Sequence, residues 1–179
     1  MAAFWRVIKT PVGPVRLAVD ADELITVDFV ALHHEPPVGR EDRRLLPEAA
    51  AWLRSCLKEP VGAPPIPLPH TSPFRAACWS ACRDIPLGQT RTYTELAAMA
   101  GNPKAARAAG SAMRENPMSL LTPCHRVVGA SGMGGYAGTV RGETPNLRLK
   151  GHILEIERRI AEGVRYRPGN ARQRVDAGL

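Results

Sequence analysis

The first thirty residues alternate between short apolar runs and turn residues. The apolar runs, at residues 4–8, 15–19 and 23–29, are rich in valine, isoleucine, leucine and phenylalanine and predict three strands. The sequences PVGP and DAD between them contain residue types that form turns, so the strands are expected to form a β-meander. Residues 44–58 predict a helix with Pro47 near its start. Apolar residues at helical spacing form its expected buried stripe: Leu46, Ala49, Ala50, Leu53 and Leu57.

A proline-rich segment separates this region from a second, helical one. The prolines within residues 60–73 exclude a helix and favour an extended linker, so we expect the domain boundary there. Ser72 and Pro73 fit the cap and the first position of a helix that reaches about Arg83.

Two further helices follow closely on one another. Thr92 and the glutamate three residues later fit the capping box that opens a helix, and Gly101 is expected to end it. Asn102 and the proline after it are expected to cap and start the next helix. That helix ends at Asn116, because a residue before proline avoids helical dihedral angles. Two short helices joined by a tight turn with glycine predict a helix-turn-helix.

One face of the second of these helices carries two arginines and otherwise almost no side chains. Arg107, Gly110, Ser111 and Arg114 follow i, i+3, i+4, i+7 spacing and therefore lie on one side. One interpretation is a solvated face on an alanine-rich helix. The other is a flat surface that lets the backbone approach the groove of a nucleic acid, with the arginines as probes.

Together these elements predict an α+β fold with two domains. A small N-terminal α/β domain is expected over residues 1–59, the linker over 60–73, and a helical domain with the helix-turn-helix over 74–162. Residues 163–179 hold four arginines and little apolar content, which predicts a flexible basic tail. Contact with DNA and simple solubilisation are equal alternatives for this tail.

Composition and charge narrow the class of protein. Of the 179 residues, 44% are hydrophobic and 23% charged, which is typical of a soluble globular protein. No apolar run is long enough to cross a bilayer, and the N-terminus lacks a secretory layout, so we expect a cytoplasmic protein, or a nuclear one in a eukaryote. The net charge is +7: residues 1–73 are nearly neutral at −1, whereas residues 74–179 hold +8. This imbalance indicates a polyanion partner for the second half.

The cysteines show no metal-binding pattern. The four cysteines, at positions 56, 78, 82 and 124, form no CxxC pair and have no histidines at zinc spacing, so no metal and no cofactor are expected. Cys78 and Cys82 are four residues apart and predict a buried pair on one helical face. Free thiols are expected throughout.

Cys124 stands directly before a histidine, in the segment TPCHRVV (122–128). Cysteine attacks as the thiolate, and an imidazole nearby can take its proton. Adjacent residues in a strand point to opposite faces, but after a proline, in an irregular turn, Cys124 and His125 could meet. The alternative from this dipeptide alone is a small buried cysteine.

The wider context resembles a known family. From Phe74 to Glu157 the chain closely resembles the O6-alkylguanine-DNA alkyltransferases, also called methylated-DNA–protein-cysteine methyltransferases. The resemblance is carried, in order, by IPLGQTRTY (85–93), ELAAMAGNPKAARAAGSAMRENP (95–117), TPCHRVVGASG (122–132), GGYAG (134–138) and KGHILEIE (150–157). The N-terminal strands are similar to the family's small α/β domain, which implies a ribonuclease H-like fold there. The segment at 139–149 is longer than the family's usual link and is expected to form a surface loop beside the pocket. The loop from Cys124 to Tyr136 is one residue shorter than usual.

The resemblance implies a catalytic relay. Cys124 matches the acceptor nucleophile, His125 the base that reaches it through a water, and Glu157 the carboxylate that orients the histidine, with the logic of a hydrolase triad. Asn116 matches an asparagine that braces the helix against the active-site turn. Tyr93 matches a tyrosine that donates a proton or hydrogen bond to the departing base. Without the family, the favoured interpretation of Glu157 is a solvated helix residue next to Arg158 and Arg159. Tyr93 could then simply pack the helix start, and Asn116 could be only a helix stop.

The resemblance also implies a DNA-binding surface and a base pocket. Arg107 matches an arginine that enters the base stack and fills the place of a flipped guanine. The rest of the DNA-binding face is formed by Ala106, Gly110, Ser111 and Arg114. The walls and edges of the guanine pocket are matched by Met113, the Val127 carbonyl, Tyr136 and the Ala137 amide. For Met113 a position in the core is the alternative.

The predicted function is therefore DNA repair by direct reversal. The resemblance implies a monomer that binds double-stranded DNA containing O6-alkylguanine, flips the base and moves its alkyl group irreversibly to Cys124, with O4 of alkylthymine as a further substrate. Three alternatives remain: a lesion-binding protein without transfer activity, a cysteine hydrolase using Cys124 and His125, and a helix-turn-helix transcription factor. The presence of Cys124 argues against a lesion-binding protein without transfer activity. A cysteine hydrolase would leave Arg107 unexplained, and a transcription factor would have no use for Cys124, His125 and Glu157.

Overall fold

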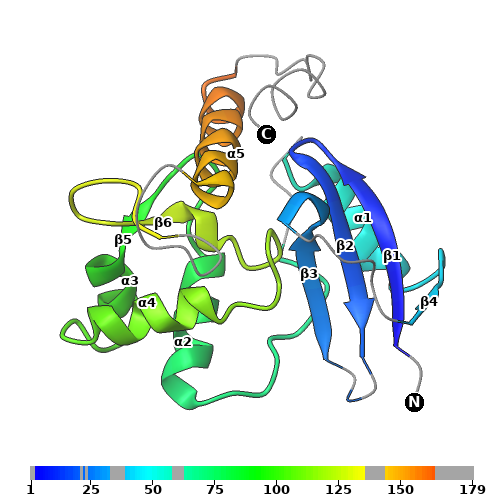
Figure 1. Cartoon of the computed structure of the whole chain (residues 1–179). Coiled ribbons are helices and arrows are strands. Elements are labelled where there is room, and N and C mark those ends of the chain that lie inside the picture. The colour runs from blue at the N-terminus through cyan, green and yellow to red at the C-terminus, as the bar shows by residue number, and fades with distance from the viewer. Residues whose placement is uncertain are drawn as a thin grey trace.

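The computed structural model describes residues 3–20, 22, 24–32, 39–57, 63–135 and 144–163. Over these residues the chain combines α-helices with a small sheet, as the sequence predicts. Figure 1 shows the sheet on one side of the molecule and most of the helices on the other. Among the described residues, no helix is both long and apolar enough to cross a membrane.

The sheet is built from the first forty-one residues. Strands β1 (Phe4–Thr10), β2 (Gly13–Val19) and β3 (Ile25–Phe29) run antiparallel to their neighbours, which confirms the predicted meander. The short strand β4 (Arg40–Glu41), which the sequence does not predict, adds to β1 in parallel and gives the order β3-β2-β1-β4. A turn of 3-10 helix, η1 (Val30–Leu32), follows β3. The inward side chains of the strands are buried in the core, among them Ile8, Val15, Leu17, Val27 and Phe29.

Helix α1 (Pro47–Ser55) packs against β1 and is shorter than the predicted helix over 44–58. It begins at Pro47 because Leu46 has the left-handed dihedral φ of 44°, and a residue before proline is kept out of the helical region. Four members of the predicted stripe are buried, namely Ala49, Ala50, Leu53 and Leu57, and Leu46 is half-buried.

The second half consists of helices connected by short irregular segments. Helix α2 (Pro73–Arg83) begins after Ser72 as predicted, and Cys78 and Cys82 lie buried on it. Strand β5 (Arg91–Thr92) leads into α3 (Tyr93–Met99), and the predicted capping box is present: the Thr92 hydroxyl accepts from the Glu95 N–H, and the Glu95 carboxylate accepts from the Thr92 N–H.

The start of the next helix was predicted wrongly. Helix α4 (Ala106–Arg114) begins four residues after Asn102, with Ala105 at its cap position. Asn102 belongs to a separate turn, because its N–H donates to the Ala97 carbonyl and its own carbonyl accepts from the Ala105 N–H. Gly101, with φ of 86°, reverses the chain between the helices.

Helix α5 (Pro145–Ala161) ends the described chain and is preceded by a 3-10 turn, η2 (Cys124–Arg126), and strand β6 (Val127–Val128). The loop expected over 139–149 is wrong for its last part, because Thr144 caps α5 and its hydroxyl accepts from the Leu147 N–H. The remainder of that loop and residues 164–179 of the expected tail lie outside the described residues.

The sheet and the helical half share a core and a backbone contact. The edge strand β3 pairs with the chain after α4: the Val27 N–H donates to the Pro117 carbonyl at 2.8 Å, and the Ser119 N–H donates to the Val27 carbonyl at 2.8 Å. This contact fixes the segment that leads from α4 to Cys124.

Candidate active site

The candidate site is built on the segment from Asn116 to Arg126, which we call the acceptor turn. Asn116 follows α4 and holds the turn closed with both ends of its amide. Its Oδ1 accepts from the Met118 N–H at 3.0 Å, and its Nδ2 donates to the Thr122 carbonyl at 2.8 Å. The same carbonyl accepts the Cys124 N–H at 2.8 Å. Asn116 is therefore bound to the backbone that carries Cys124, beyond any role in ending the helix.

The acceptor turn contains a residue in an unfavourable conformation. Leu120 has φ of 68°, in the left-handed region, where a leucine costs roughly 1–3 kcal/mol. Its side chain is buried. The neighbouring contacts must therefore hold the turn in this shape.

Cys124 opens η2 and is 8% exposed. Burial raises the pKa of its thiol, and the Asn116 amide, the charge of Lys150 and the N–H groups of Cys124 and His125 act in the opposite direction. The net result is a protonated cysteine at neutral pH, so a nucleophilic role requires a base.

His125 is buried beside Glu157 of α5. Its Nε2 lies 2.8 Å from Glu157 Oε1, and its Nδ1 has no hydrogen-bond partner among the described residues. Burial lowers the pKa of His125, so the ring is neutral near pH 7. Because an ionised carboxylate can only accept, the proton of the neutral ring sits on Nε2 and Nδ1 carries the lone pair. Nδ1 can then take a proton.

Glu157 is fully buried, so its interpretation as a solvated helix residue is wrong. Arg126 donates hydrogen bonds to both carboxylate oxygens of Glu157, from Nε to Oε2 at 2.8 Å and from Nη2 to Oε1 at 2.9 Å. Its Nη1 donates to the Ile85 carbonyl at 2.6 Å. Burial alone would raise the pKa of Glu157, but His125 and Arg126 together lower it to about 2. A buried carboxylate thus stays ionised because it is paired.

Lys150 is a second buried charge near the site, and no sequence pattern predicts a role for it. Its Nζ donates to three carbonyls, those of Val127 at 2.7 Å, Met133 at 2.6 Å and Gly135 at 2.9 Å. Burial lowers its pKa to about 8. The ammonium group ties β6 and the loop after it to α5, in which Lys150 and Glu157 are seven residues apart on the buried face.

Tyr93 lies against the same loop. Parallel pairing of β5 with β6 brings the start of α3 beside Val128, and the Tyr93 hydroxyl donates to the Gly135 carbonyl at 3.4 Å. Gly134, with φ of 68°, must be glycine, since a Cβ there would lie 2.8 Å from the Gly129 nitrogen and 3.1 Å from the Tyr93 ring. Of the expected pocket residues, Met113 and Val127 are buried, whereas Tyr136 and Ala137 lie outside the described residues.

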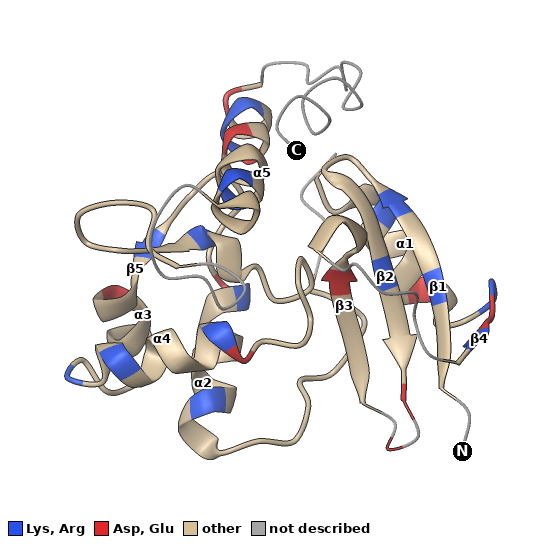
Figure 2. Cartoon of the chain, viewed as in Figure 1, with Lys and Arg blue, Asp and Glu red and all other residues tan. Residues whose placement is uncertain are grey.

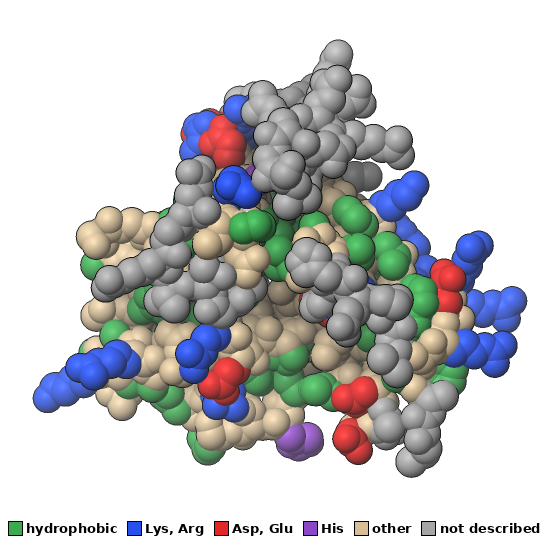
Figure 3. All heavy atoms as spheres, viewed as in Figure 1, with side chains coloured by type: hydrophobic (Ala, Val, Ile, Leu, Met, Phe, Trp, Pro, Cys, Tyr) green, Lys and Arg blue, Asp and Glu red, His purple; other side chains and the backbone are tan. Residues whose placement is uncertain are grey.

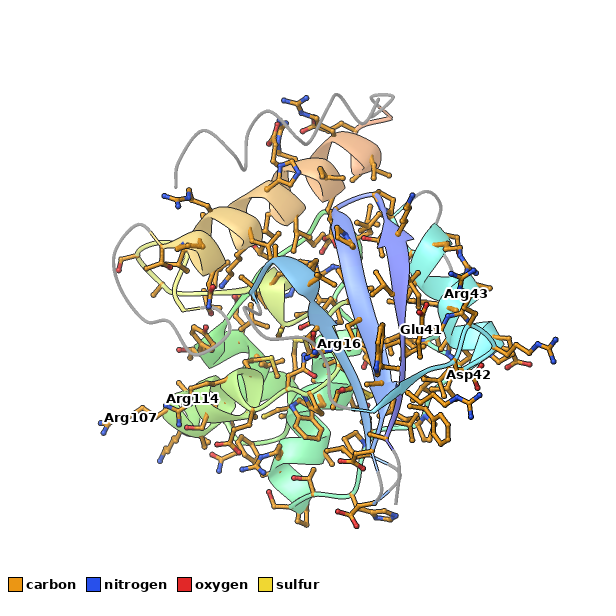
Figure 4. The ribbon with its side chains drawn as sticks, turned by 45° about the vertical axis from the view of Figure 1, so that its right-hand side comes forward. Arg16, Glu41, Asp42, Arg43, Arg107 and Arg114 are labelled. Carbon is orange, nitrogen blue, oxygen red and sulfur yellow. The ribbon has the colours of Figure 1, made fainter. Side chains whose placement is uncertain are left out.

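The predicted arginine face of α4 is exposed. Arg107, Ser111 and Arg114 are exposed, Ala106 and Gly110 are half-exposed, and the opposite side is buried through Ala109, Ala112 and Met113. Helix α4 contains no acidic residue, as the absence of red on it in Figure 2 shows. In Figure 4, Arg107 and Arg114 lie on the side of the molecule opposite to Arg43. Figure 3 shows basic side chains projecting from the surface where Figure 1 places α3 and α4. This face can reach an anionic partner.

Within the described residues, no group of three or more His, Cys, Asp or Glu side chains could hold a metal ion. The chemistry available at this site is that of a buried thiol, a neutral imidazole and a paired carboxylate.

Over most of its length the chain is similar to known proteins. A family model described as "6-O-methylguanine DNA methyltransferase, DNA binding domain" matches residues 73–159. The methylated-DNA–protein-cysteine methyltransferase of Methanosarcina acetivorans is 35% identical over 159 residues, which cover 86% of this chain and 97% of that protein. The crystal structure of the Mycobacterium tuberculosis O6-methylguanine methyltransferase has a TM-score of 0.69 at 31% identity, covering 87% of this chain and 93% of that one. The structure of the M. tuberculosis OGT in complex with DNA has a TM-score of 0.67 at 30% identity, covering 87% and 92%.

Proposed function

This chain belongs to the methylated-DNA–protein-cysteine methyltransferase family, and from that premise we propose that Cys124 is the cysteine that accepts the alkyl group. The expected family and activity are confirmed: the chain is a DNA-repair enzyme that transfers a methyl group from DNA to protein. The observation that carries the assignment to Cys124 is the buried pairing of the next residue, His125, with Glu157. Cys56, Cys78 and Cys82 have no histidine pair of this kind among the described contacts.

The proposed reaction is a displacement at the alkyl carbon. His125 Nδ1 takes the proton of the Cys124 thiol through a water, and Glu157 stabilises the imidazolium that forms. The thiolate then forms a carbon–sulfur bond as the carbon–O6 bond of the guanine breaks. The electron pair of that bond stays with the guanine, which takes a proton or hydrogen bond from the Tyr93 hydroxyl. Because the product is a thioether with no carbonyl for water to attack, the protein acts once.

We propose that α3, the turn after it and α4 act as the helix-turn-helix that binds duplex DNA. The guanine must leave the stack, because its O6 cannot be reached in line inside a duplex, and extrusion costs a few kcal/mol. Arg107 would enter the vacated place, while Ala106, Gly110 and Ser111 allow close approach and Arg114 contacts phosphate.

The finer assignments belong to the same proposal. They are an O6-alkylguanine substrate with O4 of alkylthymine as a further one, and a pocket formed by Met113, Val127, Tyr136 and Ala137. They also include a monomer that is cytoplasmic, or nuclear in a eukaryote, and a ribonuclease H-like N-terminal domain over 1–59 joined through 60–73 to a domain over 74–162. Support for a DNA partner comes from the exposed, acid-free face of α4.

Mass spectrometry after reaction with O6-methylguanine DNA tests this proposal. One methyl group per protein is expected, located on the TPCHR peptide, and Cys124→Ala should bind the lesion without being modified. Repeated turnover would indicate a hydrolase, and modification of another cysteine with Cys124 untouched would contradict the proposed site. Binding without any transfer would indicate a lesion-binding protein.

A further inference from the structure

An arginine outside the relay reaches the acceptor turn. Arg83 is the last residue of α2, and its Nε donates to the Thr122 hydroxyl at 3.1 Å. Its Nη1 donates to the Ile66 carbonyl at 2.9 Å, in the segment that connects the sheet half to α2. Both partners are buried, since Thr122 is 0% and Ile66 5% exposed. One side chain therefore joins the connecting segment to the residue two positions before Cys124.

Thr122 is the point at which the acceptor turn is held. Its carbonyl accepts both the Cys124 N–H and the Asn116 Nδ2, each at 2.8 Å. Its own N–H donates to the Met118 carbonyl at 2.8 Å. With the Arg83 contact, every polar group of Thr122 is engaged. A displacement of Thr122 would therefore move the backbone of Cys124 together with the amide of Asn116.

The acceptor turn needs anchors outside itself. Leu120, with φ of 68°, disfavours its shape, so the flanking contacts must determine it. At one end, Val27 of β3 pairs with Pro117 and Ser119. At the other end, the side-chain anchor of Thr122 is Arg83.

The burial of Arg83 is not explained by packing alone. Its Nη2 is buried and has no partner among the described residues, and burial lowers the pKa of the guanidinium. An apolar side chain of similar length would fill the space without burying an unpaired donor. The hydrogen bonds from Arg83 to the Thr122 hydroxyl and the Ile66 carbonyl explain an arginine at this position better.

We propose that Arg83 is a positioning residue for alkyl transfer: through the Thr122 hydroxyl it fixes the Thr122 carbonyl, and thereby the placement of Cys124 and Asn116. This inference rests on the proposed role of Cys124. Among the described contacts Arg83 does not touch the Cys124 thiol, and it lies on α2, outside the proposed helix-turn-helix. Its effect therefore falls on the rate of the chemical step and not on DNA affinity.

Single-turnover kinetics with O6-methylguanine DNA separates this role from a purely structural one. Thr122→Val removes the hydroxyl at constant shape, and Thr122→Ser keeps it. We expect Thr122→Val and Arg83→Met each to lower the rate constant at saturating DNA by about tenfold, with an unchanged half-saturating DNA concentration. Thr122→Ser should stay within about twofold of the parent rate. The double variant should be no slower than either single variant, because both changes break one contact.

Thr71→Val is the matched control. Thr71 also accepts a hydrogen bond from an arginine of α2, Arg75 Nη1 at 3.3 Å, but it does not contact the acceptor turn among the described contacts. Its rate should equal that of the parent. If Thr122→Val lowers only the final fraction of methylated protein, with the rate constant unchanged, Arg83 and Thr122 serve folding alone and the inference is wrong. If the parent protein itself leaves Cys124 unmodified, the proposed function fails instead.

Discussion

Glu157 lies between His125 and Arg126, and this placement determines the protonation state of His125. Arg126 contacts both carboxylate oxygens, so the buried charge of Glu157 is compensated even when His125 is neutral. The His125 imidazole can therefore be neutral, and able to accept a proton, before the reaction. Once it has accepted the proton, the Glu157 carboxylate beside it stabilises the imidazolium. Arg126 thus completes a site that Cys124, His125 and Glu157 would leave with an uncompensated buried charge.

Replacing Glu157 by glutamine should slow alkyl transfer by roughly 100-fold, since the imidazolium formed during thiol deprotonation loses its counter-charge. The rate constant at saturating methylated DNA measures this effect. Glu155→Gln is the control on the same helix, because Glu155 is half-exposed and pairs only with Arg158 and Arg159 among the described contacts. Equal rates for the two variants would remove Glu157 from the relay.

The pKa of Glu157 also predicts how stability depends on pH. Its pKa falls from 4.5 to about 2 on folding, so the folded state binds this proton less tightly than the unfolded state. The stabilisation is complete above pH 4.5 and is lost as pH falls toward 2. The lowered pKa of His125 acts in the same direction, beginning at its ordinary value of 6.5.

Urea unfolding of the parent and of Glu157→Gln at pH 7, 5 and 3 measures this dependence. The parent should lose unfolding free energy in both steps, and the loss from pH 5 to 3 should be smaller in the variant. A variant with the same loss below pH 5 would show that the ionised Glu157 does not stabilise the fold.

Some site residues could be predicted from the sequence and others could not. Cys124 and His125 are adjacent, and Asn116 precedes a proline, so local chemistry already marks them. Arg126 acts through Glu157, 31 residues away, and Lys150 acts through carbonyls 15 to 23 residues away. Only the packing of α5 against the acceptor turn and the segment after it brings these groups together. A lysine within an apolar helical stripe is the one signal that could have drawn attention to Lys150.

At the level of elements, the predictions held where one local interaction decides the boundary. The start of α3 is set by the Thr92–Glu95 capping box, which involves residues three apart. The start of α4 depends on a competition, because Asn102 can cap a helix or close a turn. The contact of its N–H with Ala97 of the preceding helix selects the turn. That choice depends on how α3 ends, which the cap pattern alone does not contain.

The placement of Arg107 on α4 predicts a substrate-dependent effect. Arg107→Ala should lower the rate with duplex DNA by at least about tenfold, since the flipped base loses the side chain that replaces it in the stack. The reaction with free O6-benzylguanine should stay within about twofold, because no stack has to be held open. Both rates are measured as the loss of free Cys124.

Arg159→Ala is the control for charge, since Arg159 is an exposed arginine on α5. It should leave both reactions nearly unchanged. An equal loss on both substrates in Arg107→Ala would place Arg107 in the chemistry or in folding, and not in base flipping.

For the whole molecule, the pairing of β3 with the acceptor turn joins the two halves more directly than a linker would. Val27 shares hydrogen bonds with Pro117 and Ser119, so the sheet supports the same turn that carries Cys124. This contact spans about ninety residues of sequence and involves only backbone groups, namely N–H groups, which proline alone lacks, and carbonyl groups, which every residue provides. The sequence therefore predicts the meander and the helices but cannot show which strand edge meets the turn.

The distribution of charge predicts how DNA affinity responds to salt. Residues 74–179 hold +8 while residues 1–73 hold −1, and binding should release counterions mainly at the second half. Arg114→Ala should reduce the slope of log affinity against log salt by about one, because it deletes one phosphate contact. Arg43→Ala removes the same charge from the opposite side of the molecule, where the Arg43 side chain is 89% exposed, and should leave the slope unchanged. Equal slopes for the parent and Arg114→Ala would contradict the phosphate contact assigned to α4.

Truncation of residues 163–179 removes four arginines and one aspartate and distinguishes the two alternatives for the tail. If the tail contacts phosphate, the slope of log affinity against log salt falls by about one or more, at an unchanged rate with saturating DNA. If the tail only solubilises the protein, slope and affinity both persist.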